Sequence, residues 1–578
     1  MTPSWRALLA VGLLLLSGCA SDGDSDGATP APGTSARDPL TEPVHAIGQH
    51  LDHTFVGQTG TQLYVDYVLP EPVPDGGAPV ILVFTPYQDA DTQVDAGEGD
   101  PIVADRPYNA GLVERFVPFG YAVAFADVRG NHNAGGCIDQ TGPEQWKDGY
   151  DYVEWLGTQS WSNGKVGMYG ASYDGETQFT TAMMAPPHLA TIVPVASVSN
   201  QYEWSFYQGV PYETQPLAGM GSYFAGSAVP STRPEDAALY PEKLECQQQQ
   251  FEAGLDFSGD MTTFWKERDY RPMAKQIKAS VLHVHGLADW NVRPIHVDPL
   301  FNEIASEKRA VFGQWGHAYP DRDDWQDLLH AWYDHYLFGR ENGILERLPP
   351  VLIEDNQEQF HGIASFPALD AEWMELELSA DGTLTAPGSA SPGELELADY
   401  PEEVLASAPM VDNQGAPAAL DAPDRLEFTF KTTEELRVVG RPEVAFTAAT
   451  DERSTHWVAH LNVDGAECLG TQVICENAGY QDTRHRDGLD DPKDLEPNVP
   501  YNLTIRMYPQ YDVIPAGSTV RLVLTNNDAE VSQDNTFARS FVTVGDGKAV
   551  LRLPLHPGGI ALPHDELPDV YPGYIGPE

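Results

Sequence analysis

Basic side chains are scarce in this sequence of 578 residues. Lysine and arginine number 33 against 86 aspartates and glutamates, which gives a formal net charge of −53 at pH 7. Such a chain repels the phosphates of nucleic acids, so nucleic acid is not expected as a partner. Two interpretations of the charge remain: adaptation to high salt, where ions screen the repulsion, and an ordinary acidic exported protein.

Apolar runs long enough for a membrane-crossing helix are also missing. The early run 7–16 is too short to span a bilayer, follows Arg6 and is typical of a signal-peptide core. Its end, Leu16-Ser17-Gly18-Cys19, resembles a bacterial lipobox, in which the cysteine is acylated and becomes the mature N-terminus. Residues 1–19 are therefore predicted to be a lipoprotein signal, and a simple secretory signal with an incidental cysteine is the alternative.

This interpretation predicts an exported protein on the outer face of the cell membrane or on its periplasmic side, held by a lipid on Cys19. Residues 20–45 are rich in Ser, Asp, Gly, Pro and Thr, so they are expected to form a flexible tether.

Cysteine is rare as well, since only five occur and four remain after Cys19. An even number in an exported chain permits two disulfides, with three pairings. Closeness in sequence favours Cys468 with Cys475, and Cys137 with Cys246 follows by elimination. Four buried free thiols are the alternative.

Strand-like and helix-like segments alternate between residues 46 and 345, except in one stretch. The segments 144–156 and 325–337 are predicted to be helices. Continuous apolar runs, typical of buried parallel strands, occupy residues 79–84, 121–126, 166–169, 280–285 and 310–312. The alternation predicts a doubly wound α/β sheet. It lapses at about 200–272, where a helical stretch at 241–253 lies among aromatic and polar residues, so an inserted helical cap is predicted there.

Helical patterns nearly vanish after about Gly339. Short alternating strands follow, separated by Pro, Gly and Asp turns, at 425–431, 457–463, 501–507 and 519–525. This pattern predicts a β-sandwich or jelly roll over residues 346–578.

One serine stands where a predicted strand meets a predicted helix, in Gly170-Ala171-Ser172-Tyr173-Asp174-Gly175. A nucleophile on a sharp strand-to-helix turn needs small neighbours, because bulky ones would clash. The helix that follows directs its N-terminus at Ser172, and the amide of Tyr173 could stabilise an oxyanion. The short form Gly-x-Ser-x-Gly is not met strictly, because Asp174 precedes the last glycine.

Two partners follow in the order that an α/β-hydrolase requires. Asp289 comes just after the strand 280–285, and His317 just after the strand at 310–312. The serine hydroxyl needs a base, which His317 would supply, while Asp289 would hold the imidazole in one tautomer. The ordered triple Ser172, Asp289 and His317 therefore predicts a catalytic triad.

A metal site is the alternative for His283 and His285, which share one face of a strand at a common ligand spacing. The next acid, Asp289, comes later than a compact His-x-His-x-Asp site would place it. A buried strand entering the active-site loop is the preferred interpretation, and no metal is expected.

The chain resembles the X-prolyl dipeptidyl-peptidase and cocaine-esterase group of serine hydrolases. The elbow 170–175 matches this group's Gly-x-Ser-Tyr-x-Gly, and residues 285–292 (HGLADWNV) look especially like the X-prolyl dipeptidyl-peptidase branch. Other similar segments are Pro86-Tyr87, 127–130 with Gly135-Gly136, 264–268, Pro500-Tyr501, 514–517 and Arg521-Leu522. The resemblance implies an α/β hydrolase with a helical cap and a C-terminal jelly-roll, galactose-binding-like domain.

The resemblance further implies acyl transfer to water without any cofactor. Ser172 would attack a carbonyl, and the Tyr87 hydroxyl with the Tyr173 amide would form the oxyanion hole. A packed loop aromatic is the alternative for Tyr87.

Three functions remain open. An exported X-Pro dipeptidyl-peptidase is favoured; the second is an esterase or amidase of small acyl compounds, as in cocaine esterases and β-lactam acylases; the third is an inactive surface binding protein. A dipeptidyl-peptidase needs carboxylates for a free amino terminus and a flat apolar site for proline. Candidates for that pocket are Glu203, Trp204, Tyr207, Trp290 and Tyr319, with solvated or core roles as the alternatives.

Overall fold

The computed structural model describes residues 43–87, 111–212, 234–246, 258–320, 322–399, 423–464, 477–527, 538–557 and 560–562. The predicted signal peptide with Cys19, residues 20–42 of the tether, and Cys468 with Cys475 lie outside these residues. In the part of the chain so described, no helix is long and apolar enough to cross a membrane.

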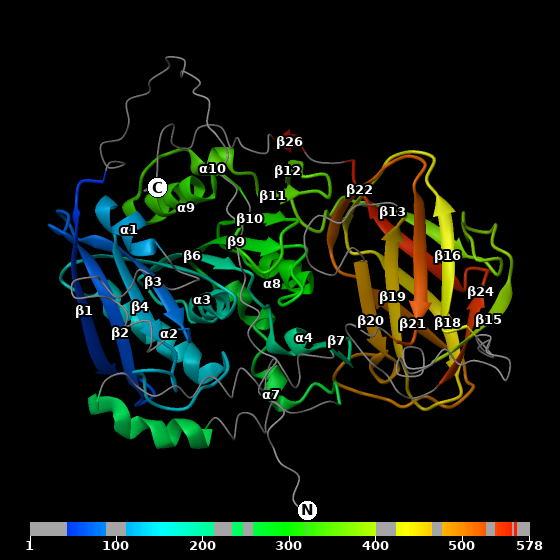
Figure 1. Ribbon diagram of the computed structural model, residues 1–578, viewed down its shortest axis with the longest axis horizontal. Helices are drawn as coiled ribbons and strands as arrows, with labels where there is room; N and C mark the ends of the chain where they lie inside the picture. Colours follow the sequence, from blue (N-terminus) through cyan, green and yellow to red (C-terminus); the bar gives the residue numbers. More distant parts are fainter. Residues whose placement is uncertain are drawn as a thin grey trace, which may run out of the picture. The chain divides into compact units, whose positions relative to one another are not determined.

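An 11-stranded sheet forms the first part of the structure (Figure 1). Its order is β1 (Ala46–Val56), β2 (Gln62–Glu71), β4 (Ala122–Asp127), β3 (Ala78–Thr85), β5 (Ser162–Ala171), β6 (Leu189–Val195), β9 (Ser280–Gly286), β10 (Lys308–Gly313), β11 (Val351–Glu354), β12 (Phe360–Ile363) and β26 (Ile560–Leu562). The strands from β4 to β11 run parallel. The predicted α/β sheet is confirmed.

Helices cover both faces of this sheet, so its central strands are buried on both sides. α2 (Pro143–Gly157) and α3 (Tyr173–Met183) pack in one hydrophobic cluster, and α1 (Leu112–Phe116) and α9 (Trp325–Tyr333) in the other (Figure 1). Every residue of β3, β4 and β9 is buried, which explains their unbroken apolar sequences. The predicted helix 325–337 continues past α9 as a π-helical turn, Asp334–Phe338, and Arg340 after it donates to the buried Asp334.

The sheet continues past residue 345, where the sequence predicts the domain boundary. β11 adds to β10 in parallel, β12 returns antiparallel, and β26 joins from near the other end of the chain. Strands of three or four residues carry too little pattern to be assigned to one of two sheets from sequence alone.

Two antiparallel sheets form the second part of the structure. The larger contains β13 (Glu372–Leu378), β14 (Leu384–Thr385), β15 (Gly393–Ala398), β17 (Leu436–Gly440), β18 (Glu443–Thr450), β21 (Tyr501–Arg506), β22 (Gln510–Ile514), β24 (Arg539–Val544) and β25 (Ala549–Leu555). The smaller has the order β16 (Arg425–Lys431), β23 (Thr519–Thr525), β19 (His456–Val463) and β20 (Asn477–Asp482). Phe428 and Trp457 of the smaller sheet share one core with Val444 and Leu551 of the larger. A β-sandwich is therefore present, and the jelly-roll topology stays a prediction.

The predicted cap region consists of short elements where the structure describes it. They are α4 (Gln201–Ser205), the ribbon of β7 (Phe206–Tyr207) and β8 (Val210–Pro211), η5 (Pro234–Leu239), α7 (Thr263–Lys266) and η6 (Arg271–Gln276). Of the predicted helical stretch 241–253, residues 241–246 are helical and the others lie outside the described residues.

Candidate active site

Four parallel strands direct the predicted catalytic residues to one edge of the sheet. Tyr87 follows β3, Ser172 follows β5, Asp289 follows β9, and His317 follows β10. Because parallel strands place their carboxyl ends on the same edge, all four loops open on that side. The order of β3, β5, β6, β9 and β10 in the sheet brings the loops together from positions far apart in the sequence.

Ser172 occupies the turn between β5 and α3 in a strained conformation. Its φ is 62° and its ψ is −126°, a combination that residues with a side chain rarely adopt. A Cβ at Gly170 would lie 2.4 Å from Asp174 Cβ, and one at Gly175 would lie 2.7 Å from the Val195 carbonyl oxygen. A side chain at either position would clash, so both residues must be glycine. This agrees with the prediction that a sharp turn at Ser172 needs small neighbours.

Asp289 is buried and pairs with the half-buried His317. His317 Nδ1 donates to Asp289 Oδ2 at 2.7 Å, and Asp289 Oδ1 accepts the backbone amides of Asn291 and Val292 at 2.9 Å each. Burial lowers the pKa of His317, but attraction to the Asp289 carboxylate and the hydrogen bond outweigh it, so the pKa is raised above its ordinary value. With its proton on Nδ1, neutral His317 keeps Nε2 as an acceptor.

Contacts between loops hold this pair beside the serine turn. The ring of Tyr319, two residues after His317, stacks on Tyr169 of β5, the strand before Ser172, with centroids 5.6 Å apart. The amide of Ala288 donates to the Trp315 carbonyl, which joins the loops of Asp289 and His317. Among the described residues, no hydrogen bond joins His317 to Ser172; catalytic contacts are often long before substrate binds.

Tyr87 stands where an oxyanion donor would be needed. Its hydroxyl donates to Ser172 Oγ at 3.4 Å and accepts from the Tyr173 amide, also at 3.4 Å. Burial, followed by the charge of Asp174, raises the pKa of Tyr87 well above its ordinary value, so its hydroxyl keeps its proton. Both predicted oxyanion donors thus meet beside the serine hydroxyl.

The loop 127–142 supports both donors. His132 Nε2 lies 3.3 Å from the Pro86 carbonyl oxygen, next to Tyr87, and the Thr141 amide donates to the Tyr173 hydroxyl at 3.1 Å. The same hydroxyl donates to Gln145 of α2 at 2.7 Å. Tyr173 is thereby anchored through its side chain, which fixes the position of its backbone amide.

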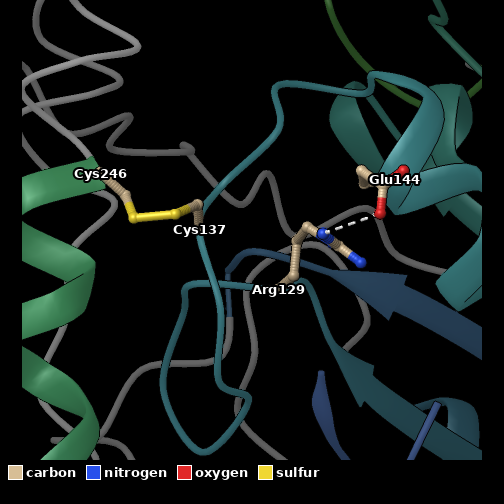
Figure 2. The surroundings of a disulfide bond; sticks show 4 residues. All are labelled: Arg129, Cys137, Glu144 and Cys246. Atoms are coloured by element: carbon tan, nitrogen blue, oxygen red, sulfur yellow. Dashed lines mark ion pairs between the residues drawn. A yellow bond between two sulfur atoms is a disulfide. The ribbon is translucent and has the colours of Figure 1, made fainter. Parts of the chain in front are cut away.

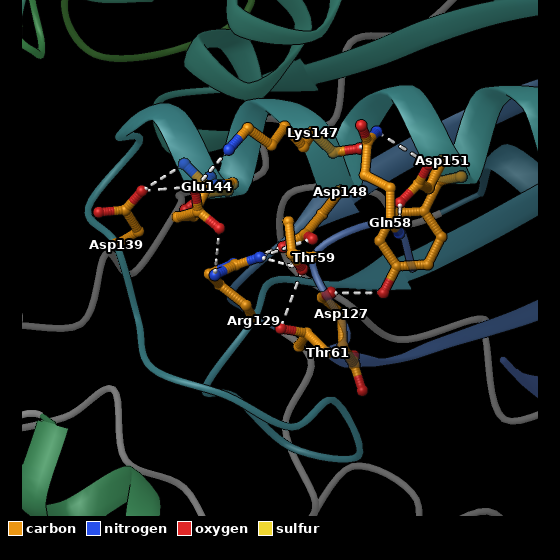
Figure 3. A network of polar contacts seen from close by, with 12 residues as sticks. Gln58, Thr59, Thr61, Asp127, Arg129, Asp139, Glu144, Lys147, Asp148 and Asp151 are labelled. Carbon is orange, nitrogen blue, oxygen red and sulfur yellow. Dashed lines mark hydrogen bonds and ion pairs between the residues drawn. The ribbon is translucent and has the colours of Figure 1, made fainter. Parts of the chain in front are cut away.

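Arg129 holds the start of this loop (Figure 3). Its guanidinium binds both oxygens of Asp148 in α2, at 2.6 and 2.8 Å, and reaches Thr59 at 3.0 Å. Burial raises the pKa of Asp148 to about 6 even though Arg129 acts to lower it. Bidentate pairs of this kind fix geometry, so the network positions the loop rather than taking part in chemistry.

A disulfide joins Cys137 of this loop to Cys246, 109 residues later (Figure 2). Lys243 of the same cap segment donates to the His132 carbonyl at 2.6 Å. One of the two pairs expected from the sequence is therefore present, and it fastens the cap region to the loop behind Tyr87.

Trp204, Trp290 and Tyr319 have different surroundings. Trp290 is 43% exposed beside Asp289. Trp204 Nε1 donates to Asn291 Oδ1 at 3.4 Å, so it lies against the loop of Asp289. Tyr319 stacks on Tyr169, as above, and is half-buried. Each of these rings therefore lies in or against one of the two loops that carry Asp289 and His317.

Tyr207 and Glu203 are already engaged. Tyr207 is buried, stacks on Tyr508 of the β-sandwich and donates to the Arg506 carbonyl at 2.6 Å. It is therefore a packing residue between cap and sandwich, a contact that sequence spacing could not show. Glu203 accepts from Arg271 at 3.0 Å and from Asn200 at 2.7 Å, and the same guanidinium also binds Asp269.

His283 and His285 are both fully buried, with rings nearly perpendicular and centroids 6.0 Å apart. Burial lowers the pKa of each, so both are neutral. His285 Nε2 donates to the Val292 carbonyl at 2.8 Å and holds the loop of Asp289 against its strand. No group of three or more metal-ligating side chains occurs among the residues that the structure describes.

Two family models match this chain. That of the X-Pro dipeptidyl-peptidase (S15 family) matches residues 59–319, and that of the X-Pro dipeptidyl-peptidase C-terminal non-catalytic domain matches residues 342–538. This chain belongs to the S15 family. A putative Xaa-Pro dipeptidyl-peptidase of Streptomyces avermitilis is 26% identical over 634 aligned positions, which cover 96% of this chain and 90% of that protein.

Solved structures agree with an S15-family hydrolase fold. A CocE/NonD family hydrolase from Staphylococcus aureus has a TM-score of 0.67 at 19% identity, covering 87% of this chain and 93% of that one. An α-amino acid ester hydrolase has a TM-score of 0.66 at 20% identity, covering 91% and 98%. The chain is thus a hydrolase with an α/β-hydrolase domain and a C-terminal β domain.

Sequence reasoning missed several polar residues around the site of this S15-family member. Arg271, which pairs with both Glu203 and Asp269, stands in a region without a regular pattern. Arg293 lies only four positions after Asp289, and that closeness was the available signal. Arg441 of the β-sandwich binds Asp298 and the Ile295 carbonyl, just beyond the loop of Asp289. Only folding brings Arg441 to this place.

Proposed function

We propose that this hydrolase is an X-Pro dipeptidyl-peptidase that acts through Ser172, His317 and Asp289. The observation that carries the proposal is the meeting of the strained Ser172 turn with Tyr87 and the Tyr173 amide, in a chain of the S15 family. The Asp289–His317 pair on the same edge supplies the general base.

In the proposed reaction, His317 Nε2 takes the hydroxyl proton as Ser172 Oγ attacks the carbonyl after proline. The Tyr87 hydroxyl and the Tyr173 amide hold the oxyanion, and the N-terminus of α3 favours the same negative charge. Collapse expels the amine, which receives the proton from His317. Water, activated by the same imidazole, then hydrolyses the acyl-enzyme and releases an Xaa-Pro dipeptide.

An esterase or amidase of small acyl compounds is the second candidate, and one observation favours it. A dipeptidyl-peptidase must hold a free amino terminus, yet the carboxylate of Glu203 is paired with Arg271. Glu176 is buried, and burial raises its pKa well above the ordinary value, which disfavours the charged form that would bind an amine. Recognition of the amine is therefore the property that separates the two candidates.

A panel of three substrates tests the assignment. An Ala-Pro anilide, the same anilide with a blocked amine and a simple aryl ester are compared by kcat/KM. We expect the free-amine anilide to be cleaved at least tenfold faster than the blocked one, because a lost charged contact costs about 1.5–3 kcal/mol. Equal rates for the two anilides, with a faster ester, would assign the enzyme to the second candidate.

Replacement of Tyr87 by phenylalanine should lower kcat by about 10²–10³-fold, the usual effect of removing one oxyanion donor. The ring remains, so packing and melting temperature should change little. Tyr67 of β2, whose ring stacks on Trp161 and contacts Trp155 edge-on, gives the matched Tyr67→Phe control with unchanged kcat. If both variants keep full activity, Tyr87 is a packing residue.

Export and lipid attachment at Cys19 are part of the proposal. The segment Leu16–Cys19 supports them, and the Cys137–Cys246 disulfide suits an oxidising compartment. A Cys19→Ala variant should move from the membrane fraction to the soluble fraction on cell lysis. A wild-type protein already in the soluble fraction would contradict the anchor.

A further inference from the structure

Arg293 differs from the other buried arginines of this acidic protein. Among the described residues, five arginines are at most 8% exposed: Arg129, Arg268, Arg293, Arg322 and Arg340. Four of these are paired with a carboxylate, in the pairs Arg129–Asp148, Arg268–Asp139, Arg322–Asp324 and Arg340–Asp334. Arg293, 6% exposed, has no such pair among the described residues.

The guanidinium of Arg293 packs on the aromatic ring of Tyr212 instead of pairing with a carboxylate. Its central carbon lies 3.6 Å from the centroid of Tyr212, and the Tyr212 hydroxyl is in turn 3.0 Å from that of Tyr508. Nε and Nη1 of Arg293 are buried and have no hydrogen-bond partner in the described structure. A buried charge without a partner is strongly unfavourable, so this arrangement calls for a ligand that completes it.

The backbone around Arg293 belongs to the loop that carries Asp289. Val292 donates to Asp289 Oδ1 and accepts from His285, while Asn291 accepts from Trp204. The Arg293 carbonyl accepts the His296 amide, which fixes the next turn. These hydrogen bonds thus hold Arg293 four residues after Asp289, the aspartate of the proposed triad.

We propose that Arg293 binds a carboxylate of the substrate, namely the C-terminal carboxylate of a short peptide. The guanidinium offers a planar fork of donors that matches a carboxylate, and stacking on Tyr212 leaves the edge of that fork for a ligand. This inference rests on the proposed function and adds to it a substrate class: free tripeptides such as Ala-Pro-Ala.

The test compares Ala-Pro-Ala with its C-terminal amide, and both with an Ala-Pro anilide that has no carboxylate. For the wild-type chain we expect kcat/KM to favour the free acid about 10- to 100-fold, through KM. Arg293→Gln should abolish this preference and leave anilide cleavage within about twofold of wild type. Arg293→Lys should keep part of the preference, because the charge remains without the fork.

The outcomes separate this inference from the function on which it rests. If the anilide is cleaved but acid and amide react alike, or Arg293→Gln keeps the preference, the role of Arg293 is wrong and the peptidase assignment stands. If the anilide is not cleaved, the peptidase assignment fails. The binding of Ala-Pro-Ala and of its amide to the Ser172→Ala variant, measured by calorimetry, then tests Arg293 separately. Tighter binding of the free acid supports the role of Arg293, and equal binding overturns that role. Arg293-dependent stabilisation by acetate, with acid and amide bound alike, would indicate a free anion instead.

Loss of folding in Arg293→Gln would show as loss of anilide cleavage and a lower melting temperature. In that case the acid-to-amide ratio of Arg293→Lys decides: a ratio about threefold or more below that of the wild type supports the proposal, and an unchanged ratio overturns it.

Discussion

Replacing Ser172 with alanine should lower kcat by about 10⁶-fold, the usual cost of removing the nucleophile of such a triad. Alanine keeps the same Cβ at φ 62°, so the turn and its strain are preserved and the melting temperature should stay close to that of the wild type. The measurement is kcat with the Ala-Pro anilide, together with labelling by a fluorophosphonate, which reacts only with an activated serine.

The Ser306→Ala variant is the matched control. Ser306 donates to the Ala279 carbonyl at 2.8 Å, just before β10 begins, at the edge of the sheet opposite His317. It should retain full activity and full labelling. Labelling of Ser172→Ala equal to wild type would place the nucleophile elsewhere, and a folded wild-type protein that is never labelled would favour an inactive binding protein.

The central strands could be predicted because burial on both faces leaves an unbroken apolar pattern, as in β3 and β9. The positions after them could be predicted as well, because a parallel sheet fixes which edge a loop opens on. Ser172, Asp289 and His317 follow from strand ends and chain order, without any knowledge of distances.

Contacts between distant segments could not be predicted in this way. Tyr207 is an aromatic residue of the kind that lines substrate pockets, yet it packs on Tyr508 about 300 positions later. Glu203 looks like a free carboxylate until folding places Arg271 against it. Whether the buried nitrogens of Arg293 have hydrogen-bond partners likewise depends on all the residues that fold around them. A single sequence cannot show that such a partner is missing.

Replacing Asp289 with asparagine should lower kcat by about 10⁴-fold while leaving the loop in place. Asparagine Oδ1 can still accept the amides of Asn291 and Val292 at the positions that Asp289 Oδ1 holds. Its nitrogen would then face His317 Nδ1 as a donor, which favours the tautomer with the proton on Nε2. That tautomer cannot take the proton of Ser172, so the rate falls although the geometry survives.

Asp355→Asn provides the control, because Asp355 pairs with His361 Nε2 at 2.7 Å, the same distance as between Asp289 and His317. It should lower the melting temperature and leave kcat unchanged. A similar loss of activity in both variants would mean that Asp289 acts only through stability.

The pH profile gives a second measurement of the same pair. His317 must be neutral to act as a base, and Asp289 raises its pKa, so kcat/KM of the wild type should fall as the pH drops through a value above 6.5. In Asp289→Asn the attraction is gone and burial alone remains, which lowers the pKa of His317. The acid limb of the residual activity should therefore move to lower pH. An acid limb at the same pH in both proteins would show that another group controls it, and the assignment of His317 as the base would be wrong.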